Sequence, residues 1–157
     1  MHIRPARPDE AELLTKIALR SKAYWGYDEA FMAACRDELT VDAATIGRIH
    51  AVVAEDGERV LGFATVVGAP PQGALDMLFV EPEHIGRGIG RALLDHVREH
   101  AEGLGFRRLL IDADPNAEPF YRAMGATRIG STPSGSIPGR ELPLLALDLA
   151  AETAAQA

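Results

Sequence analysis

The stretch that decides the fold runs from Leu75 to Ala126 and reads LDMLFVEPEHIGRGIGRALLDHVREHAEGLGFRRLLIDADPNAEPFYRAMGA. It opens on residues that are apolar on most of both faces, which predicts a strand in the middle of a sheet. A glycine-rich turn and a run with apolar side chains at helical spacing follow. The elements that this pattern predicts are a strand over 74–81, a helix over 91–105, a strand over 106–113 and a short helix over 116–124.

The flanking sequence adds helices before this stretch and hairpin-linked strands on both sides of it. Asp56-Gly57 joins two apolar runs and is a strong signal for a β-hairpin. The absence of internal repeats or a low-complexity linker favours one α/β domain over residues 1–149, with a flexible tail over 150–157. The flanking elements predicted are a strand over 1–7, helices from Pro8 and over 29–39, and strands over 50–55, 59–67, 127–130 and 141–149.

Composition excludes several classes of protein. The chain has 157 residues and a net charge of −7, so it repels polyanions, and nucleic acid is not expected as a partner. No window reaches the ~18 consecutive apolar residues of a membrane span, and no signal peptide is recognisable, so no membrane association is expected. The single cysteine, Cys35, gives no internal disulfide, and the cytoplasm is the expected location.

The glycine-rich turn has the composition of a phosphate-binding loop. Gly86, Gly88 and Gly90 let the backbone approach a ligand closely and aim N–H groups at it, beside Arg87 and Arg91. A dinucleotide fingerprint is disfavoured, because the spacing is G-x-G-x-G and the flanking strands are linked by hairpins. A Walker loop is disfavoured because no Gly-Lys-Ser/Thr ends the run.

These residues carry a resemblance to a known family. The segment from Leu75 to Ala126 resembles the acetyl-CoA-binding core of the GNAT N-acetyltransferases, specifically where V-x-P precedes the glycine loop and N-A-x-x-F-Y-x-x-x-G follows the next strand. Ile85 and Ala126 depart from the family's usual basic residue and Phe. The resemblance implies a mixed, mostly antiparallel, twisted sheet with a splayed central strand pair, flanked by about four helices.

The resemblance also implies a cofactor site, for acetyl-CoA as co-substrate and without a metal. Main-chain amides of the loop would bind the diphosphate, and amides of Leu78 and Val80 would line a slot for the pantetheine arm, one of them polarising the thioester carbonyl. Asn116 would hydrogen-bond the pantetheine, and Tyr121 would lie near the sulfur. The full expected set is Leu78, Phe79, Val80, Ile85, Gly86, Arg87, Gly88, Ile89, Gly90, Arg91, Asn116, Phe120 and Tyr121.

The implied reaction is direct attack of a primary amine, of a small molecule or a peptide, on the thioester. Tyr121 is the expected general acid for the leaving thiolate. Asp76 is the first candidate for the general base and Glu81 the second, and Asp112 and Asp114 also border the expected slot. A water chain is an alternative to all four carboxylates. The rival function is an acyl-CoA-binding sensor or regulatory domain without turnover.

The acceptor site is expected between the first two helices and near the loop before the last strand. Tyr24, Trp25 and Tyr27 are candidates for contacts with an amine through cation–π interaction, or for a hydrophobic staple between helices. Arg140 is a candidate for binding an acceptor carboxylate, or for a structural ion pair. The overall acidity favours a cationic acceptor, and exposed sheet edges leave a homodimer open.

Two further patterns are interpreted as structural. Cys35 lies among small apolar residues on a predicted helix, which favours a buried side chain over an acyl-cysteine intermediate. His96 and His100 have the i, i+4 spacing of metal ligands, but the sequence indicates no third ligand, so a solvated helix face is expected.

Overall fold

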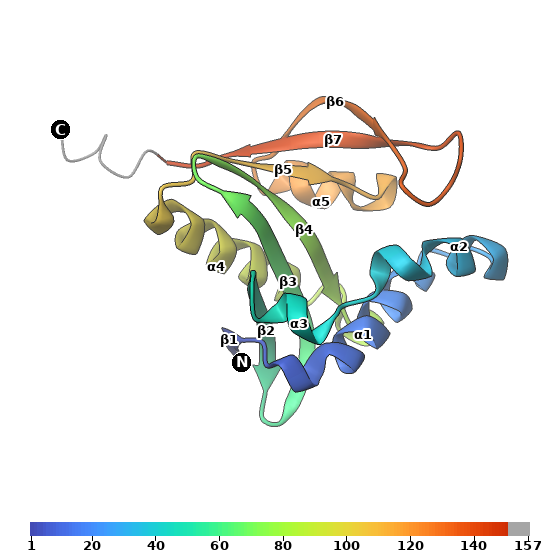
Figure 1. The fold of residues 1–157 in the computed structure, drawn as a ribbon, viewed down its shortest axis with the longest axis horizontal. Coiled ribbons are helices and arrows are strands. Elements are labelled where there is room, and N and C mark those ends of the chain that lie inside the picture. The colour runs from blue at the N-terminus through green and yellow to red at the C-terminus, as the bar shows by residue number, and fades with distance from the viewer. Residues whose placement is uncertain (151–157) are drawn as a thin grey trace.

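The computed structural model describes residues 1–150, and within them one mixed sheet of seven strands is flanked by helices on both faces (Figure 1). This confirms the predicted fold class. The strands are β1 (His2–Pro5), β2 (His50–Asp56), β3 (Arg59–Ala69), β4 (Gln72–Val80), β5 (Arg108–Asp112), β6 (Thr127–Pro133) and β7 (Glu141–Asp148). The α-helices are α1 (Ala11–Ala23), α2 (Glu29–Leu39), α3 (Ala43–Ile46), α4 (Ile89–Leu104) and α5 (Glu118–Ala123), and three 3-10 turns, Pro8–Glu10, Pro82–His84 and Pro115–Ala117, precede α1, the glycine loop and α5.

The strand order β1-β2-β3-β4-β5-β7-β6 places β4 in the middle of the sheet. Every neighbouring pair is antiparallel except β4 and β5, which are parallel and are connected through α4. This pair is joined only between residues 72–74 and 108–110. Beyond that point the two strands separate, as expected for a splayed central pair, and Figure 1 shows the space opening between β4 and the β5–β7 unit.

A β-bulge in β4 lies next to the point where the strands separate. Thr65 of β3 is opposite Met77, but the next residue, Val66, is opposite Leu75, so Asp76 is the extra residue. A bulge bends its strand and increases the local twist. The bulge therefore directs the C-terminal half of β4 away from β5.

Each face of the sheet has its own apolar core. One core packs beneath α4, where Leu93, Leu94 and Val97 are fully buried, and includes Tyr121 of α5. The other packs beneath α1, where Leu14 and Ile17 are fully buried. Alternate residues of β2 and β3 point to opposite faces of the sheet and belong to the two different cores. Both faces of these strands are therefore buried under helices, as Figure 1 shows.

Two details differ from the sequence-based expectations. The four-residue helix α3 was not predicted, because one turn is too short to give a periodic signal. The helical spacing of Val97 and Ala101 predicts that Leu104 is buried, but this residue is 55% exposed, and Leu94 is fully buried instead. The predicted tail lies, except for Ala150, outside the described residues. Within residues 1–150, no helix is long and apolar enough to cross a membrane.

Candidate active site

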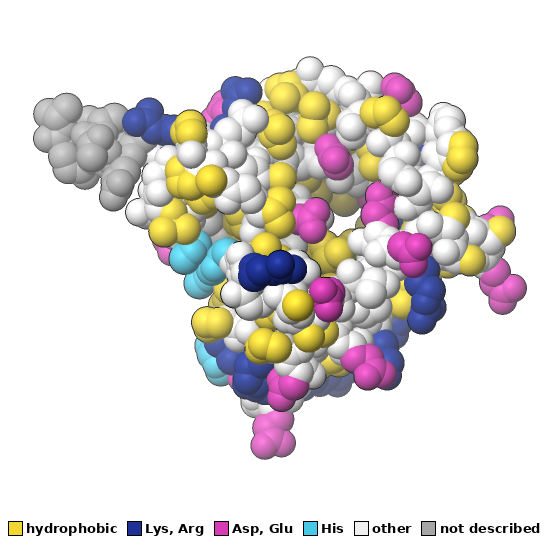
Figure 2. Space-filling view, in the orientation of Figure 1, with side chains coloured by type: hydrophobic (Ala, Val, Ile, Leu, Met, Phe, Trp, Pro, Cys, Tyr) yellow, Lys and Arg dark blue, Asp and Glu magenta, His cyan; other side chains and the backbone are white. Residues whose placement is uncertain are grey.

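A cavity of about 710 Å³ occupies the space where β4 and β5 separate. Its walls come from both separated strands, the glycine loop, α1, α2, α5 and the loop between β6 and β7. Figure 2 shows the molecule hollowed at this position, with acidic side chains around the opening. The cavity therefore combines the segment that decided the fold with elements from both ends of the chain.

The backbone of β4 presents hydrogen-bond donors to this cavity. The amide of Glu81 donates to the Leu61 carbonyl of β3 at 2.8 Å. Because alternate residues of a strand direct their amides to the same side, the Phe79 amide also points to β3, whereas those of Leu78 and Val80 point to the opposite side, where β5 has moved away. The two amides expected to line the slot therefore face it, and the Phe79 amide does not.

The glycine loop ends at the N-terminus of α4. Gly86 and Gly88 have φ values of 87° and 84°, a left-handed conformation that strains residues with a Cβ atom. The Arg87 amide donates to the His84 carbonyl at 3.3 Å and is used by the turn. The Ile85 amide is likewise used by the turn, since it donates to the Pro82 carbonyl at 3.3 Å. The amides of Gly86 and of residues 88–91 have no main-chain partner among the described residues, and they make a donor-rich end of the cavity.

Gly90 and Ile85, two further residues of the expected cofactor site, have their positions determined by packing against neighbouring elements. A Cβ atom on Gly90 would lie 3.4 Å from the Phe120 ring, so the glycine allows α4 to approach α5 closely. Ile85 packs against the core beneath α4 and also lines the cavity. Arg91 lines the cavity at this same end, where it adds positive charge to that of the helix N-terminus.

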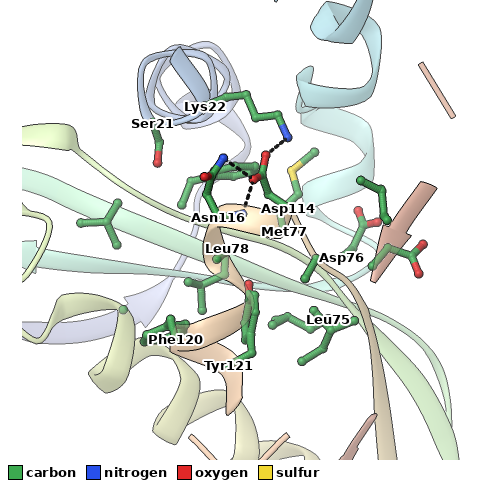
Figure 3. A pocket seen from close by; sticks show the side chains of 18 of the residues that line it. Ser21, Lys22, Leu75, Asp76, Met77, Leu78, Asp114, Asn116, Phe120 and Tyr121 are labelled. Atoms are coloured by element: carbon green, nitrogen blue, oxygen red, sulfur yellow. Dashed lines mark hydrogen bonds and ion pairs between the residues drawn. The ribbon is translucent and has the colours of Figure 1, made fainter. Parts of the chain in front are cut away.

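Tyr121 lies on α5 with its hydroxyl directed into the cavity (Figure 3). The residue is 6% exposed, and no hydrogen bond joins its hydroxyl to another of residues 1–150. Burial, followed by the negative charge of Asp114, raises the pKa of the Tyr121 hydroxyl well above its usual value. Tyr121 therefore carries its proton at neutral pH and has an unused donor facing the cavity.

Three carboxylates that form no ion pair with another of residues 1–150 line the cavity away from the glycine loop. They are Asp76 at the bulge, Asp112 at the end of β5 and Glu38 of α2. Burial, then the charges of Asp112 and Glu38, raises the pKa of Asp76 above its usual value. The Asp76 side chain is exposed to solvent, but only to the solvent inside the cavity. The surrounding protein therefore still reduces the hydration of its carboxylate. A carboxylate with a raised pKa is a stronger base.

Glu81, the second base candidate, has a different environment. Its carboxylate accepts two hydrogen bonds from the Arg20 guanidinium, at 2.9 and 2.6 Å, and it is 9% exposed. Glu81 is not among the residues that line the cavity. The structure thus places Glu81 in a bidentate ion pair that joins the end of β4 to α1.

A polar cluster at the mouth of the cavity converges on Asp114, the residue that precedes the last 3-10 turn (Figure 3). Lys22 Nζ lies 2.6 Å from Asp114 Oδ2, and the Tyr27 hydroxyl lies 2.8 Å from the same oxygen. Asn116 donates to Asp114 Oδ1 through its backbone and side-chain amides, and Arg140 donates to the Tyr27 hydroxyl at 2.8 Å. The sequence-predicted residues Tyr27, Asn116 and Arg140 are thus brought together.

The predicted aromatic contacts with an acceptor separate into two groups. The Tyr27 ring stacks on Phe31 with 4.0 Å between centroids, and the Arg140 guanidinium carbon lies 5.2 Å from the Tyr27 centroid. The Arg140 guanidinium therefore already covers the Tyr27 ring, where an acceptor cation was expected. Trp25 lines the cavity and is 42% exposed, whereas Tyr24 packs edge-on against Trp25 and does not line it.

The sequence did not identify Lys22 and Glu38 as residues of this site. Both occur on amphipathic helices where a charged residue usually marks a solvated face, so no local signal distinguishes them. Asp114 was considered only as a carboxylate near the slot. Its position directly before Pro115 and Asn116 is, however, a helix N-cap pattern, and the side chain does accept from the Asn116 amide.

Three of the five histidines, His50, His96 and His100, form a cluster outside the cavity. His50 of β2 stacks on His100 at 3.6 Å between ring centroids and lies 5.9 Å from His96. The third ring that the sequence did not indicate is therefore present, but the rings are nearly parallel. Within the described part of the chain, no group of three or more His, Cys, Asp or Glu residues is arranged to hold a metal ion. Cys35 is buried and unpaired.

With this geometry in place, comparison with known proteins gives the class. Residues 16–126 match the model of the acetyltransferase (GNAT) family. A peptidyl-lysine N-acetyltransferase, YjaB, of Salmonella typhimurium is 30% identical over 148 residues, which cover 94% of this chain and 97% of the relative. An aminoglycoside N(6')-acetyltransferase type 1 of Stenotrophomonas maltophilia is 35% identical over 102 residues, covering 57% of this chain and 66% of that one. The chain belongs to the GNAT family of acetyltransferases.

Solved structures agree on the fold. A GCN5-related N-acetyltransferase from Rhodopseudomonas palustris superposes with a TM-score of 0.78 at 25% identity, covering 94% of this chain and 95% of that chain. The PaiA N-acetyltransferase from Thermoplasma acidophilum, solved in complex with coenzyme A, superposes with a TM-score of 0.77 at 18% identity, covering 94% and 98%. The overall fold of this chain is therefore the fold of these two acetyltransferases.

Proposed function

We propose that residues 1–149 act as one acetyltransferase domain that moves an acetyl group from acetyl-CoA to a primary amine by direct attack. The observation that carries this proposal is the separation of β4 from β5, which leaves the Leu78 and Val80 amides facing a cavity that also contains the Tyr121 hydroxyl. Family membership supports the acetyl donor. The glycine loop supplies donors at the end of the cavity where a diphosphate would be bound.

Acetyl-CoA would bind along the separated strands. In the proposal, the amides of Gly86 and of residues 88–91 hold the diphosphate, and the pantetheine arm lies against β4 like an added strand, paired with the Leu78 and Val80 amides. Asn116 contacts the pantetheine from the β5 side, and Phe79 and Phe120 pack beside it. The thioester is then placed near Tyr121, between the glycine loop and the three carboxylates.

The chemistry requires no covalent enzyme intermediate. The amine nitrogen forms a bond to the thioester carbonyl carbon, and a β4 amide donates to the oxyanion that develops. The carbon–sulfur bond then breaks and Tyr121 gives its proton to the departing thiolate. The nitrogen, which still carries one proton too many, loses it as the carbonyl re-forms, and this proton returns to Tyr121 through solvent. Burial raises the pKa of Tyr121 and so disfavours loss of its proton. The same surroundings raise the proton affinity of the thiolate, so the two effects of burial on the proton transfer oppose each other.

The proton released by the attacking ammonium is proposed to go to Asp76. Its raised pKa makes it a stronger base than an ordinary aspartate, and it lines the cavity, whereas Glu81 is paired with Arg20. Glu81 is therefore proposed to support the fold of the site and not to take the proton. Asp76 acts directly or through one water molecule.

The acceptor is proposed to be a cationic amine of a small molecule or a peptide. Glu38, Asp76 and Asp112 give the acceptor end of the cavity negative charge, which attracts an ammonium group. The names of two relatives, a peptidyl-lysine and an aminoglycoside acetyltransferase, describe acceptors of these two kinds. Trp25 is the aromatic side chain placed to contact the acceptor, because Tyr27 is occupied by Arg140.

Two measurements test the proposed function. A thermal melt with acetyl-CoA at 100 times its dissociation constant is expected to gain about 2.7 kcal/mol, or roughly 5–11 °C, with no gain from NADH. Release of free thiol from acetyl-CoA is then followed with a lysine-containing peptide, an aminoglycoside and 1,5-diaminopentane. A melt shift without thiol release from any of these amines would favour the sensor function, and the absence of a melt shift would refute the cofactor assignment.

The proposal retains two expectations about the surroundings of the enzyme. A cytoplasmic location agrees with the single cysteine, which is unpaired and buried. A homodimer remains a prediction from the edge strands β1 and β6. Sedimentation of the purified chain at two concentrations tests it, and a constant monomer mass would contradict it.

A further inference from the structure

We propose that Asp114 is a positioning residue that holds the two acceptor walls, the turn after α1 and the loop between β6 and β7, against the end of β5. The assignment of these walls to the acceptor rests on the proposed function. The positioning by Asp114 depends only on contacts within the chain. Asp114 ends no regular element and was expected only as one of several carboxylates near the slot. Its contacts distinguish it from the other three.

The two oxygens of the Asp114 carboxylate have different partners. Oδ1 accepts from the backbone amide of Asn116 at 2.8 Å and from Asn116 Nδ2 at 3.0 Å. Oδ2 lies 2.6 Å from Lys22 Nζ and 3.7 Å from Arg140 Nη2. The Tyr27 hydroxyl lies within 3.1 Å of both oxygens. One oxygen therefore serves the cofactor side of the site, and the other serves the acceptor side.

The partners of Oδ2 come from two segments that are far apart in the sequence, and Asp114 joins both of them to the end of β5. Lys22 is in the last turn of α1, Tyr27 follows the turn after that helix, and Arg140 precedes β7. Arg140 also donates to the Tyr27 hydroxyl at 2.8 Å and lies over the stacked rings of Tyr27 and Phe31, at 5.2 and 4.8 Å. Removing the Asp114 charge therefore leaves the two walls in contact with each other but weakens the attachment of both walls to the end of β5.

Charge and burial explain why this contact is strong. The Lys22, Asp114 and Arg140 side chains are only 14%, 12% and 19% exposed. Burial alone would raise the pKa of Asp114, but the hydrogen bonds from Lys22 and the Asn116 amide, with the charge of Lys22, lower it below its usual value. The carboxylate is thus ionised at neutral pH and neutralises cations that would otherwise repel an ammonium.

Asp114 also fixes the orientation of the Asn116 amide. An ionised carboxylate only accepts, so the Asn116 side chain must direct its NH₂ group to Asp114, and the other hydrogen points to the Tyr27 hydroxyl at 3.0 Å. Both donors are used, and the Asn116 carbonyl oxygen is left free. Asn116 therefore accepts a hydrogen bond from a pantetheine N–H and does not donate one.

The variant Asp114→Asn separates the two sides. Asparagine is an equally good N-cap and retains an acceptor oxygen for Asn116. Its other group is an uncharged NH₂, which gives Lys22 and Arg140 no negative charge to pair with. We expect the KM for the lysine-containing peptide to rise about 10-fold, while the dissociation constant of CoA stays within about 2-fold. Asp114→Ala, which removes both oxygens, is expected to weaken CoA binding as well. Asp148→Asn, which breaks the exposed pair with Arg108, is the control and should change neither.

A second readout requires no turnover. Amide hydrogen exchange of Asp114→Asn is expected to increase over residues 24–28 and 134–140, where the wild type has backbone hydrogen bonds such as Gly26 N to Ala23 O and Arg140 N to Ile137 O. Exchange in the glycine loop should stay unchanged. If the wild type acetylates none of the amines, the proposed function fails, and the exchange experiment still decides the positioning. Unchanged exchange in both walls, or equal weakening of CoA and peptide, would overturn it.

Discussion

The two ends of the cavity are built in different ways. The end proposed to bind the cofactor, called the cofactor end, consists of main-chain amides on β4, the glycine loop and α4, all within residues 75–91. The end proposed to bind the acceptor, called the acceptor end, consists of side chains from α1, α2, β5 and the loop before β7, several of which meet at Asp114. A site made from backbone depends on local conformation and tolerates sequence change, whereas a site made from convergent side chains changes with each residue. This difference allows one family to keep its donor and vary its acceptor.

The largest expected effect comes from disturbing the backbone end. Gly88→Val places a branched side chain on a residue with φ of 84°, and should weaken CoA binding about 1,000-fold through loss of two or more amide contacts to phosphate. Isothermal titration with CoA measures this. Gly57→Val is the matched control, since Gly57 has φ of 63° in the hairpin turn between β2 and β3 and is remote from the cavity. Equal CoA affinity in both variants would contradict the backbone account.

The next effect tests the chemistry between the two ends. Tyr121→Phe removes the only hydroxyl proposed to protonate the thiolate, and kcat should fall about 100-fold while CoA affinity stays unchanged. Steady-state kinetics with the best of the three amines measures it. Tyr24→Phe, at a tyrosine that does not line the cavity, is the control and should have wild-type kcat. A Tyr121→Phe enzyme with normal kcat would remove Tyr121 from the mechanism.

A smaller effect, with a defined pH dependence, concerns the base. Ionised Asp76 is the active form, so kcat/KM should fall as the pH decreases through its raised pKa, and Asp76→Asn should lose about 30-fold at neutral pH together with this acid limb. Asp112→Asn removes a neighbouring charge that raises the pKa of Asp76, so the acid limb should move to lower pH. An acid limb unchanged in both variants would assign the base to water or to another group.

The same shift has a consequence for stability. The folded state holds the Asp76 proton more tightly than the unfolded chain, so ionisation of Asp76 opposes folding as the pH rises through the raised pKa. Asp76→Asn is therefore expected to melt at the same temperature as the wild type or slightly higher at pH 7. A lower melting temperature would show that the carboxylate has a structural role.

A further effect on stability lies outside both ends of the cavity, and it separates acid unfolding from acid loss of activity. Burial, then the nearby His100 and His96, lowers the pKa of His50 to about 4, whereas the unfolded chain binds this proton near 6.5. The contribution of neutral His50 to the free energy of unfolding is therefore fully present above pH 6.5. It decreases as the pH falls towards 4, by about 1 kcal/mol for each pH unit. His50→Gln should flatten the melting temperature over this range, and exposed His2→Gln should not. Identical pH profiles for both would contradict the shift.

The cofactor end could be predicted from the sequence because its signals are local. Three alternating glycines between an apolar strand and an amphipathic run specify a turn with free amides. The separation of the strands came from family resemblance, and the bulge at Asp76 gives its physical cause. The limits of the prediction were at element ends, as with Leu104, which continues the spacing of α4 but lies past the point where the sheet covers it.

The acceptor end could not be predicted to the same depth. Lys22 and Asp114 are 92 residues apart in sequence, and Tyr27 and Arg140 are 113 apart, so only the packing of α1 and the last hairpin around the sheet brings them together. The alternatives for Arg140, acceptor contact or ion pair, depended on this arrangement, and the structure shows the ion pair. The third histidine is a similar case, since His50 reaches His100 only because α4 covers β2.

The central claim is that a CoA thioester lies between β4 and β5 with its diphosphate on the glycine loop. A crystal structure of the chain with bound CoA tests it most directly. The diphosphate is predicted within hydrogen-bond distance of the amides of Gly86 and residues 88–91, with the pantetheine paired to Leu78 and Val80 and its sulfur beside the Tyr121 hydroxyl. CoA bound elsewhere, or β4 and β5 joined along their full length, would contradict it.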